Sequence, residues 1–240
     1  MGNPMAMIEA SNLYKSFGDT VAVDGLSMSL GAGVTGFLGP NGAGKSTTMR
    51  MLTGFLAPDR GEVSICGHDL SQHRRNAQAA IGYLPEAAGG YGALTVREFL
   101  SYAGECRGLW GRALAGAVDR AVGLVDAGSA IDRRLSTLSK GWRQRAWFAQ
   151  ALLHDPPVLI MDEPTDGLDP NQKDHMRYLI RRLAPEKCIL LSTHILEEAE
   201  EVCDRAIIID RGRIVADDQP AALTDDRGRL AAAFRRVTQS

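Results

Sequence analysis

The sequence predicts an α/β protein built on a mainly parallel sheet whose two faces are covered. The first observation is a set of short apolar runs, typical of strands buried on both faces, at 34–38, 158–161, 188–191 and 206–209. The second is that segments of helical periodicity separate these runs, as in chains where strands alternate with helices. The third is a content of 45% hydrophobic residues in 240, which is enough for a sizeable core.

The composition excludes several classes of protein. A net charge of −2 and a pI near 6.2 give no sign of the dominant basic face of a nucleic-acid binder, so we expect no nucleic-acid partner. No apolar run approaches the roughly 18 residues that a membrane helix needs. The N-terminal MGNPMAMIEASN lacks the basic region and apolar core of a secretion signal, and Ala6 breaks the myristoylation motif. We therefore expect a cytoplasmic protein that is able to bind a membrane partner.

The four cysteines are too scattered for a zinc site or a disulfide framework. No two of them form a CxxC pair, and no histidines cluster with them. We expect free thiols at Cys66, Cys106, Cys188 and Cys203.

The middle of the chain differs from the rest because it shows helical periodicity and no convincing strand. It opens with the glycine-rich AAGGYG, and Thr95 and Glu98 then fit a capping box, with Leu94 and Phe99 placed as its hydrophobic staple. We interpret residues from about 87 to 140 as a helical subdomain inserted into a domain that spans 1–222.

The last third predicts a helix, a hairpin and a tail. Apolar side chains at 3–4 spacing mark one buried helix face: Met176, Leu179, Ile180 and Leu183. The final apolar run continues through DRGR into IVA, which reads as a hairpin. We expect residues 223–240 to form a separate short amphipathic tail with Leu230, Phe234 and Val237 on one side, packed on its own domain rather than on a partner.

The stretch GPNGAGKST at 39–47 follows an apolar run, precedes a helical segment and matches the phosphate-loop pattern G-x-x-x-x-G-K-[ST]. Its glycines let backbone N–H groups turn toward phosphate oxygens, and the next helix adds favourable partial charge. We expect Lys45 to reach the β- and γ-phosphates, Ser46 to bind Mg²⁺ and Thr47 to donate to the α-phosphate. All members of the loop are candidate nucleotide contacts: Gly39, Pro40, Asn41, Gly42, Ala43, Gly44, Lys45, Ser46 and Thr47.

A second acidic element follows the apolar run of VLIMDEP. Asp162, at the end of the expected strand, is placed to hold Mg²⁺ through water, and Glu163 is placed to polarise the attacking water. Because adjacent residues on a strand point apart, the two carboxylates take different tasks.

Taken together, the motifs resemble those of ABC transporter ATP-binding subunits. GPNGAGKST, IGYLPE, LSKGWRQR, LIMDEPTDGLDP and STH lie in family order and cover nearly the whole chain. An N-K-x-D motif, which a GTPase would use to read its base, is absent from the sequence. The resemblance implies a P-loop NTPase with a RecA-like core, an N-terminal antiparallel β part and the inserted helical subdomain, using ATP and Mg²⁺.

The resemblance also gives a role to LSKGWRQR (138–145), which we call the signature segment. In the family this segment closes over the ATP of a second subunit, and Ser139, Lys140 and Gly141 occupy its central positions. A serine there also fits an ordinary helix N-cap. Asp169 matches the segment that contacts across the dimer interface. His194 matches the histidine that hydrogen-bonds the γ-phosphate and helps to place the water.

The adenine contact has two candidates in NLYKSFG. Phe17 matches the aromatic residue that stacks on the base in the family, and Tyr14 is its rival. We favour Phe17. Stacking of this kind contributes about 1–3 kcal/mol per base in nucleic-acid sites, and it discriminates little between bases.

Two positions depart from the commonest family form. Glu86 stands where glutamine is usual and would add negative charge near the γ-phosphate, although a carboxylate can also bind Mg²⁺. Lys140 and Trp142 stand where glycine and glutamine are common. Both departures resemble the branch whose ATPases pair with ABC-2 type permeases in gliding-motility, copper-processing and multidrug export systems.

The sequence therefore predicts an ATP-hydrolysing subunit that dimerises around two ATP and drives a separate membrane permease, most simply an exporter. We expect it on the cytoplasmic face of the membrane, held there by the permease. An intact site favours a homodimer, with a heterodimer left open, and the transported substrate is not encoded in the motifs. The rivals are a soluble ABC ATPase, for example in iron–sulfur assembly, and a non-hydrolysing regulatory module. The intact acid pair and His194 argue against the second.

Overall fold

The computed structural model describes residues 6–86 and 89–224. The chain order begins with the β part and the phosphate-loop unit: β1 (Ile8–Phe17), β2 (Thr20–Leu30), β3 (Gly33–Leu38), α1 (Lys45–Leu52), β4 (Arg60–Ile65), β5 (His68–Asp69), α2 (Arg74–Ala79) and β6 (Ile81–Leu84). The helical segment follows as α3 (Val96–Cys106), α4 (Gly111–Leu124), the short 3₁₀ turns η1 (Gly128–Ala130) and η2 (Leu135–Thr137), and α5 (Lys140–Leu152). The chain then returns to the sheet in β7 (Val158–Met161), α6 (Pro170–Leu183), β8 (Cys188–Thr193), α7 (Leu196–Val202), β9 (Arg205–Asp210), β10 (Arg213–Asp218) and η3 (Pro220–Leu223).

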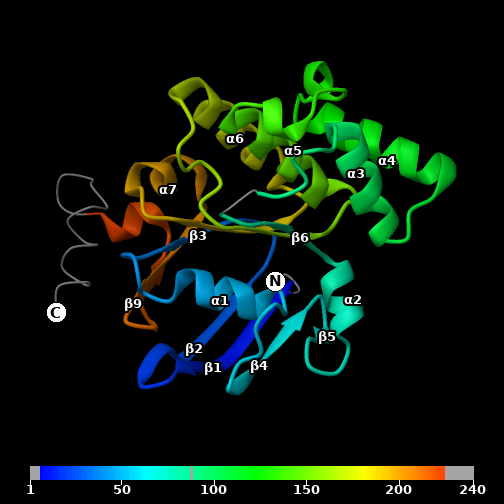
Figure 1. Cartoon of the computed structure of the whole chain (residues 1–240). Helices are drawn as coiled ribbons and strands as arrows, with labels where there is room; N and C mark the ends of the chain where they lie inside the picture. Colours follow the sequence, from blue (N-terminus) through cyan, green and yellow to red (C-terminus); the bar gives the residue numbers. More distant parts are fainter. Residues whose placement is uncertain (1–5, 87–88, 225–240) are drawn as a thin grey trace.

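The larger sheet has six strands in the order β10-β9-β3-β8-β7-β6. Its strands β9, β3, β8, β7 and β6 run parallel, and β10 is added antiparallel through the predicted hairpin with β9. The parallel sheet that the apolar runs predicted is therefore confirmed, with each run lying inside a strand. In Figure 1 this sheet crosses the middle of the molecule, with α5, α6 and α7 on one side and α1 on the other.

The smaller sheet is the antiparallel part near the N-terminus, with strand order β2-β1-β4-β5. It lies with α1 on the same side of the larger sheet (Figure 1). Each face of the larger sheet is covered, because alternate residues of its strands enter different cores. Leu159 and Met161 pack in the core with the helices α3 to α7, whereas Val158 and Ile160 pack in the core with α1 and the smaller sheet.

The helical segment between β6 and β7 has the predicted local structure. The capping box at Thr95 and Glu98 is confirmed, since the threonine hydroxyl accepts from the Glu98 N–H and the Glu98 carboxylate accepts from the Thr95 N–H. Within the described part of this segment, the strand-like pairing is an isolated bridge between Thr95 and Arg134. Helix α5 packs against α3 and α4 and also against β6, so it joins the helical segment to the sheet.

The predicted buried face of α6 is confirmed for Met176, Leu179 and Ile180, while Leu183 is only partly buried against the same core. All four cysteines are free, as expected. Within residues 6–86 and 89–224, no helix is long and apolar enough to cross a membrane. The predicted amphipathic tail, with Leu230, Phe234 and Val237, lies outside the described residues.

Candidate active site

The site candidates gather at one edge of the larger sheet because parallel strands end on the same side. The phosphate loop follows β3, Asp162 and Glu163 follow β7, His194 follows β8 and Glu86 follows β6. Ligands of open parallel sheets bind outside the carboxyl ends of their strands. The order of the strands thus brings together four segments that are far apart in the sequence.

The phosphate loop depends on glycines for its course. Gly42 and Gly44 have φ values of 81° and 105°, in the left-handed region that L side chains rarely adopt. A Cβ on Gly44 would also overlap the carbonyl oxygen of Ala22, and a Cβ on Gly39 would overlap that of Ile209. The loop is therefore pressed against neighbouring backbone at Gly39 and Gly44, which leave no room for a side chain, whereas Gly42 is required for its backbone conformation alone.

Lys45 opens α1 and is buried against its own loop. Its Nζ donates to the carbonyl oxygens of Gly39, at 2.7 Å, and Pro40, at 3.2 Å. Burial lowers the pKa of Lys45, while the nearby carboxylates of Glu163, Asp162 and Glu86 act to raise it. The ammonium group thus lies among the acidic candidates of the site.

The other loop members differ in exposure. Pro40, Asn41 and Gly42 are exposed, Ala43 and Gly44 are buried, and Ser46 and Thr47 are partly buried in the first turn of α1. The Ser46 and Thr47 hydroxyls are thus at the N-terminal end of a helix, where backbone N–H groups are free to bind an anion.

The acid pair lies just beyond its strand, which corrects the sequence expectation. β7 ends at Met161, so Asp162 is not the last strand residue, and strand alternation does not separate the two carboxylates. Instead Glu163 has a φ of 49°, an uncommon conformation for a residue other than glycine. Backbone strain of this kind is often found at functional sites.

Ser192 at the end of β8 holds the acid pair, a role that its sequence did not indicate. Its Oγ donates to Asp162 Oδ1 at 2.6 Å and accepts from the Glu163 N–H at 2.9 Å. The serine is fully buried in β8, which lies beside β7 in the larger sheet. Its sequence signal is that it is the serine of the STH motif.

His194 and Glu163 contact each other directly. The His194 Nδ1 lies 2.9 Å from Glu163 Oε2, an arrangement in which the ring N–H donates to the carboxylate. The Glu163 side chain is 12% exposed and the His194 side chain is 48% exposed. The pair therefore presents an oriented carboxylate at the surface of the site.

The oxygen donors expected to bind Mg²⁺ are compatible with that ion. Asp162 and Glu86 both lie close enough to Lys45 to influence its pKa, and Ser46 is the next residue along α1. Among the described residues, Ser192 is hydrogen-bonded to Asp162 Oδ1, and no hydrogen bond engages Oδ2. Mg²⁺ prefers such hard oxygens, and it commonly takes one or two carboxylates together with phosphate oxygens and water.

The two aromatic candidates for stacking on the adenine differ in what covers their rings. The guanidinium of Arg60 lies 4.2 Å from the ring centroid of Tyr14, so this face of the tyrosine is already covered. Phe17 is 53% exposed at the end of β1, with the Lys15 ammonium 5.7 Å from its ring centroid. The geometry favours Phe17 as the residue available for stacking.

The signature segment begins helix α5. Ser139 is its N-cap, and its hydroxyl accepts from the Trp142 N–H at 3.5 Å, which is long for a hydrogen bond. Lys140 Nζ donates to Asp166 Oδ2 at 3.0 Å. A Cβ on Gly141 would overlap the end of the Gln172 side chain.

Asp169 caps helix α6. Its Oδ1 accepts from the Gln172 N–H at 3.0 Å in a capping box, and Pro170 opens the helix. One carboxylate oxygen of Asp169 is thus hydrogen-bonded within its own chain. The sequence analysis did not predict this capping role.

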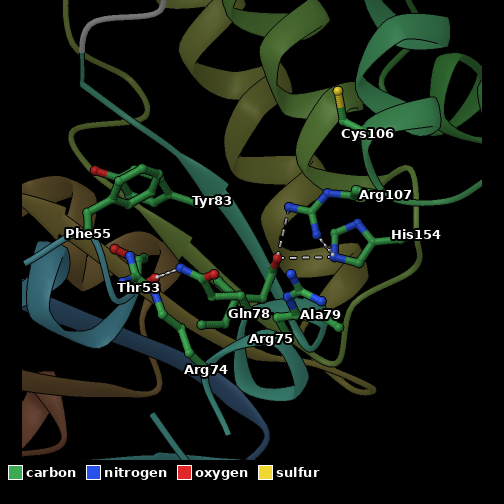
Figure 2. Close-up of a pocket in the computed structure, with 11 residues that line it drawn as sticks. Thr53, Phe55, Arg74, Arg75, Gln78, Ala79, Tyr83, Cys106, Arg107 and His154 are labelled. Atoms are coloured by element: carbon green, nitrogen blue, oxygen red, sulfur yellow. Dashed lines mark hydrogen bonds between the residues drawn. The ribbon is translucent and has the colours of Figure 1, made fainter. Parts of the chain in front are cut away.

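A basic groove lies between α2, β6 and the helical segment. Its volume is about 790 Å³, and its walls include Phe55, Arg74, Arg75, Arg107 and His154. Figure 2 shows Arg107 and His154 converging on a backbone oxygen, which is that of Ile81. No acidic side chain lines this groove in the described part of the chain, although the protein as a whole is slightly acidic.

Comparisons with known proteins agree with these observations. A family model described as "ABC transporter" matches residues 23–166. The Nod factor export ATP-binding protein I of Paraburkholderia xenovorans is 42% identical over 92% of this chain and 73% of its own length. The protein of the same name from Bradyrhizobium diazoefficiens is 41% identical over 91% of this chain and 72% of its own.

Solved structures have the same architecture. The structure titled as the ATP binding subunit of an ABC transporter superposes with a TM-score of 0.85 at 27% identity, covering 96% of this chain and 99% of that one. A bacterial Atm1-family ABC exporter with ATP bound superposes with a TM-score of 0.82 at 25% identity, over 98% of this chain and 42% of the exporter chain.

Proposed function

The chain belongs to the ABC transporter family, and from that premise we propose that this ATP-binding subunit and ATPase pairs with a second copy to drive an export permease. The observation that carries the proposal is the His194–Glu163 contact of 2.9 Å beside the buried Lys45, at the edge where the phosphate loop opens. An oriented base and a phosphate-binding cation are the parts that hydrolysis of a γ-phosphate requires.

Within one subunit, the roles follow from chemistry. Lys45 and the loop N–H groups bind the β- and γ-phosphates, and the exposed ring of Phe17 stacks on the adenine. The Glu163 carboxylate accepts a hydrogen bond from the attacking water, while His194 holds that carboxylate in place. Ser46, Glu86 and, through water, Asp162 would hold Mg²⁺, which supplies positive charge against the phosphate oxygens when bound.

Across the dimer, we assign Ser139, Lys140 and Gly141 to the partner's ATP. The N-terminal end of α5 carries free N–H groups and favourable partial charge for a γ-phosphate, and Gly141 allows close approach of backbone. Asp169 lies at the start of α6, where its second carboxylate oxygen is available to the neighbouring subunit. One chain has one phosphate loop and one signature segment, which favours a homodimer with two shared sites.

We place the permease in the basic groove. The 70% exposed Phe55 offers an apolar contact, and Arg75 has no hydrogen-bond or ion-pair partner among the described residues. A cytoplasmic segment of the permease that carries both an apolar and an acidic side chain would satisfy these groups. The names of the relatives and the ABC-2 branch support export, and the permease would hold the subunit on the cytoplasmic face of the membrane.

The hydrolytic part is tested with Glu163→Gln. We expect turnover to fall by about 10² or more, because general-base catalysis contributes at least that factor, while ATP binding stays within about twofold. Phosphate release and equilibrium binding of labelled ATP measure the two quantities, and light scattering should show an ATP-dependent dimer of the variant. Undiminished turnover of Glu163→Gln would contradict the role of the base.

The transport part is tested by recovery of the tagged chain from its native membranes in mild detergent. We expect a multi-span protein at equal copy number, identified by mass spectrometry. Arg74→Glu combined with Arg75→Glu should lose this partner and keep basal ATPase activity, with Arg112→Glu on α4 as the matched control. Recovery with soluble partners alone would refute the permease assignment.

A further inference from the structure

Glu198 is a buried acid on α7 that the proposed mechanism does not use. It is 4% exposed, and both of its carboxylate oxygens have partners. Oε2 accepts from the hydroxyls of Thr165, at 2.6 Å, and Thr193, at 3.1 Å. Oε1 accepts from Lys173 Nζ at 2.9 Å. A buried carboxylate with this many partners is well compensated for its loss of water.

The two hydroxyl partners adjoin the two proposed catalytic side chains. Thr165 lies two residues after Glu163, and Thr193 immediately precedes His194. A single oxygen of Glu198 thus binds both of the segments that bring Glu163 and His194 together, although these residues are 31 positions apart in the sequence.

Other contacts extend the same connection. The Thr193 hydroxyl also accepts from the Ile195 N–H at 3.0 Å, which fixes the turn around His194. Lys173 belongs to α6, the helix that Asp169 caps. Gln144 of α5 donates to the carbonyl oxygen of Pro164 at 3.2 Å, so the signature helix contacts the same segment.

We propose that Glu198 is a positioning residue for the ATPase reaction, acting through Thr165 and Thr193 to hold Glu163 and His194 at their hydrogen-bonding distance. This inference rests on the proposed roles of those two residues. Its physical basis is that displacement of a catalytic group by about 1 Å can lower a rate by about 10²-fold. In the described part of the chain, no side-chain hydrogen bond or ion pair joins this network to the phosphate loop, so nucleotide binding should not depend on it.

Glu198→Gln and Thr165→Val separate this role from simple support of the fold. The amide of glutamine offers a single acceptor oxygen, so it cannot accept from both hydroxyls and from Lys173 in the way the carboxylate does. Thr165→Val removes one hydroxyl with little change in shape, and Glu198 is the hydrogen-bond partner of that hydroxyl among the described residues. The matched control is Glu197→Gln, the exposed neighbour on the same helix.

The experiment measures kcat, the affinity for ATP and thermal unfolding of the full chain for each variant. We expect kcat to fall about tenfold or more in Glu198→Gln and less in Thr165→Val, with ATP affinity within about twofold and the Glu197→Gln control unchanged. Because both changes act on one contact, the double variant should lose little beyond Glu198→Gln alone.

Equal kcat in wild type and Glu198→Gln would overturn the inference, as would a parallel loss of kcat, ATP affinity and melting temperature. If Glu198→Gln fails to fold, Thr165→Val decides, and an unchanged kcat in that variant refutes the role. Glu163→Gln distinguishes the two proposals. An active Glu163→Gln refutes the proposed function, whereas an inactive one beside an active Glu198→Gln refutes only the positioning role.

Discussion

The two halves of the proposed composite site are built in different ways. At the phosphate-loop half, short hydrogen bonds within the chain hold Lys45, Asp162, Glu163 and His194. At the signature half, Ser139 makes a long N-cap bond and Lys140 pairs with an exposed acid. The contacts of the first half lie within the fold of one chain, whereas Ser139 and Lys140 make a long contact and an exposed one.

Lys45→Ala should have the largest effect of the variants that test this contrast. Loss of a charge-assisted contact to phosphate costs about 1.5–3 kcal/mol, which is roughly 10- to 100-fold in ATP affinity. Titration with labelled ATP measures this effect, and Arg50→Ala, an exposed cation on the same helix, is the control. Affinity within twofold of wild type would show that the phosphate-loop half is not as complete as the geometry indicates.

Gly141→Ala tests whether the signature half serves a second molecule. Within its own chain the nearest atoms to the added methyl group all belong to the flexible end of Gln172, so we expect little change in melting temperature. In an ATP-bound dimer the same methyl group should weaken association about tenfold, within the 1–3 kcal/mol typical of overpacking. Light scattering in the Glu163→Gln background measures association.

Gly116→Ala, on the open surface of α4, is the control for that experiment, since a Cβ there meets nothing within 4 Å. A large loss of stability in Gly141→Ala, or full dimerisation, would remove the distinction between the two halves.

Asp169→Ala and Asp169→Asn separate the capping role from the interface role. Loss of the cap should lower the free energy of unfolding by about 1 kcal/mol in the alanine variant, while asparagine is as good an N-cap as aspartate. Chemical denaturation measures this. If the negative charge acts across the interface, Asp169→Asn should dimerise less while keeping its stability. Equal dimerisation of Asp169→Asn and wild type would show that Asp169 acts as a helix cap and that its charge does not act across the interface.

Asp166→Asn should have the smallest effect. The Lys140–Asp166 side chains are 49% and 52% exposed, and exposed ion pairs contribute about 0–1 kcal/mol. Lys140 holds the pKa of Asp166 below its usual range, so the pair persists at neutral pH. We expect stability within about 0.5 kcal/mol of wild type and slightly tighter ATP-driven dimerisation, because Lys140 is released toward the partner. A clearly weaker dimer would mean that the ion pair itself shapes the interface.

Much of the fold was predictable because its signals are local. The apolar runs, the capping box at Thr95 and the phosphate-loop spacing each lie within about a dozen residues, and the structure confirms these elements. The parallel arrangement followed from the alternation of strands and helices.

The connections within the site were not predictable, because they join segments about 30 residues apart. Ser192 reaches Asp162 across 30 positions, and Glu198 reaches Thr165 across 33. In the sequence, Glu198 is one of several acids in ILEEAEE, and nothing in the pattern distinguishes it from its neighbours. Its burial follows from the packing of Ala199 and Val202 beside it, which only the tertiary structure fixes.

The order of the strands also sets a dimension of the site. β8 lies between β3, which leads into the phosphate loop, and β7, which leads to Glu163. Adjacent strands are about 4.8 Å apart, so the two lead-in strands are separated by roughly 10 Å whatever their side chains are. This separation sets the spacing between the strand ends that lead into the phosphate loop and to Glu163. Substitutions in the loops can alter affinity and rate, but a change of this spacing would require a new strand order.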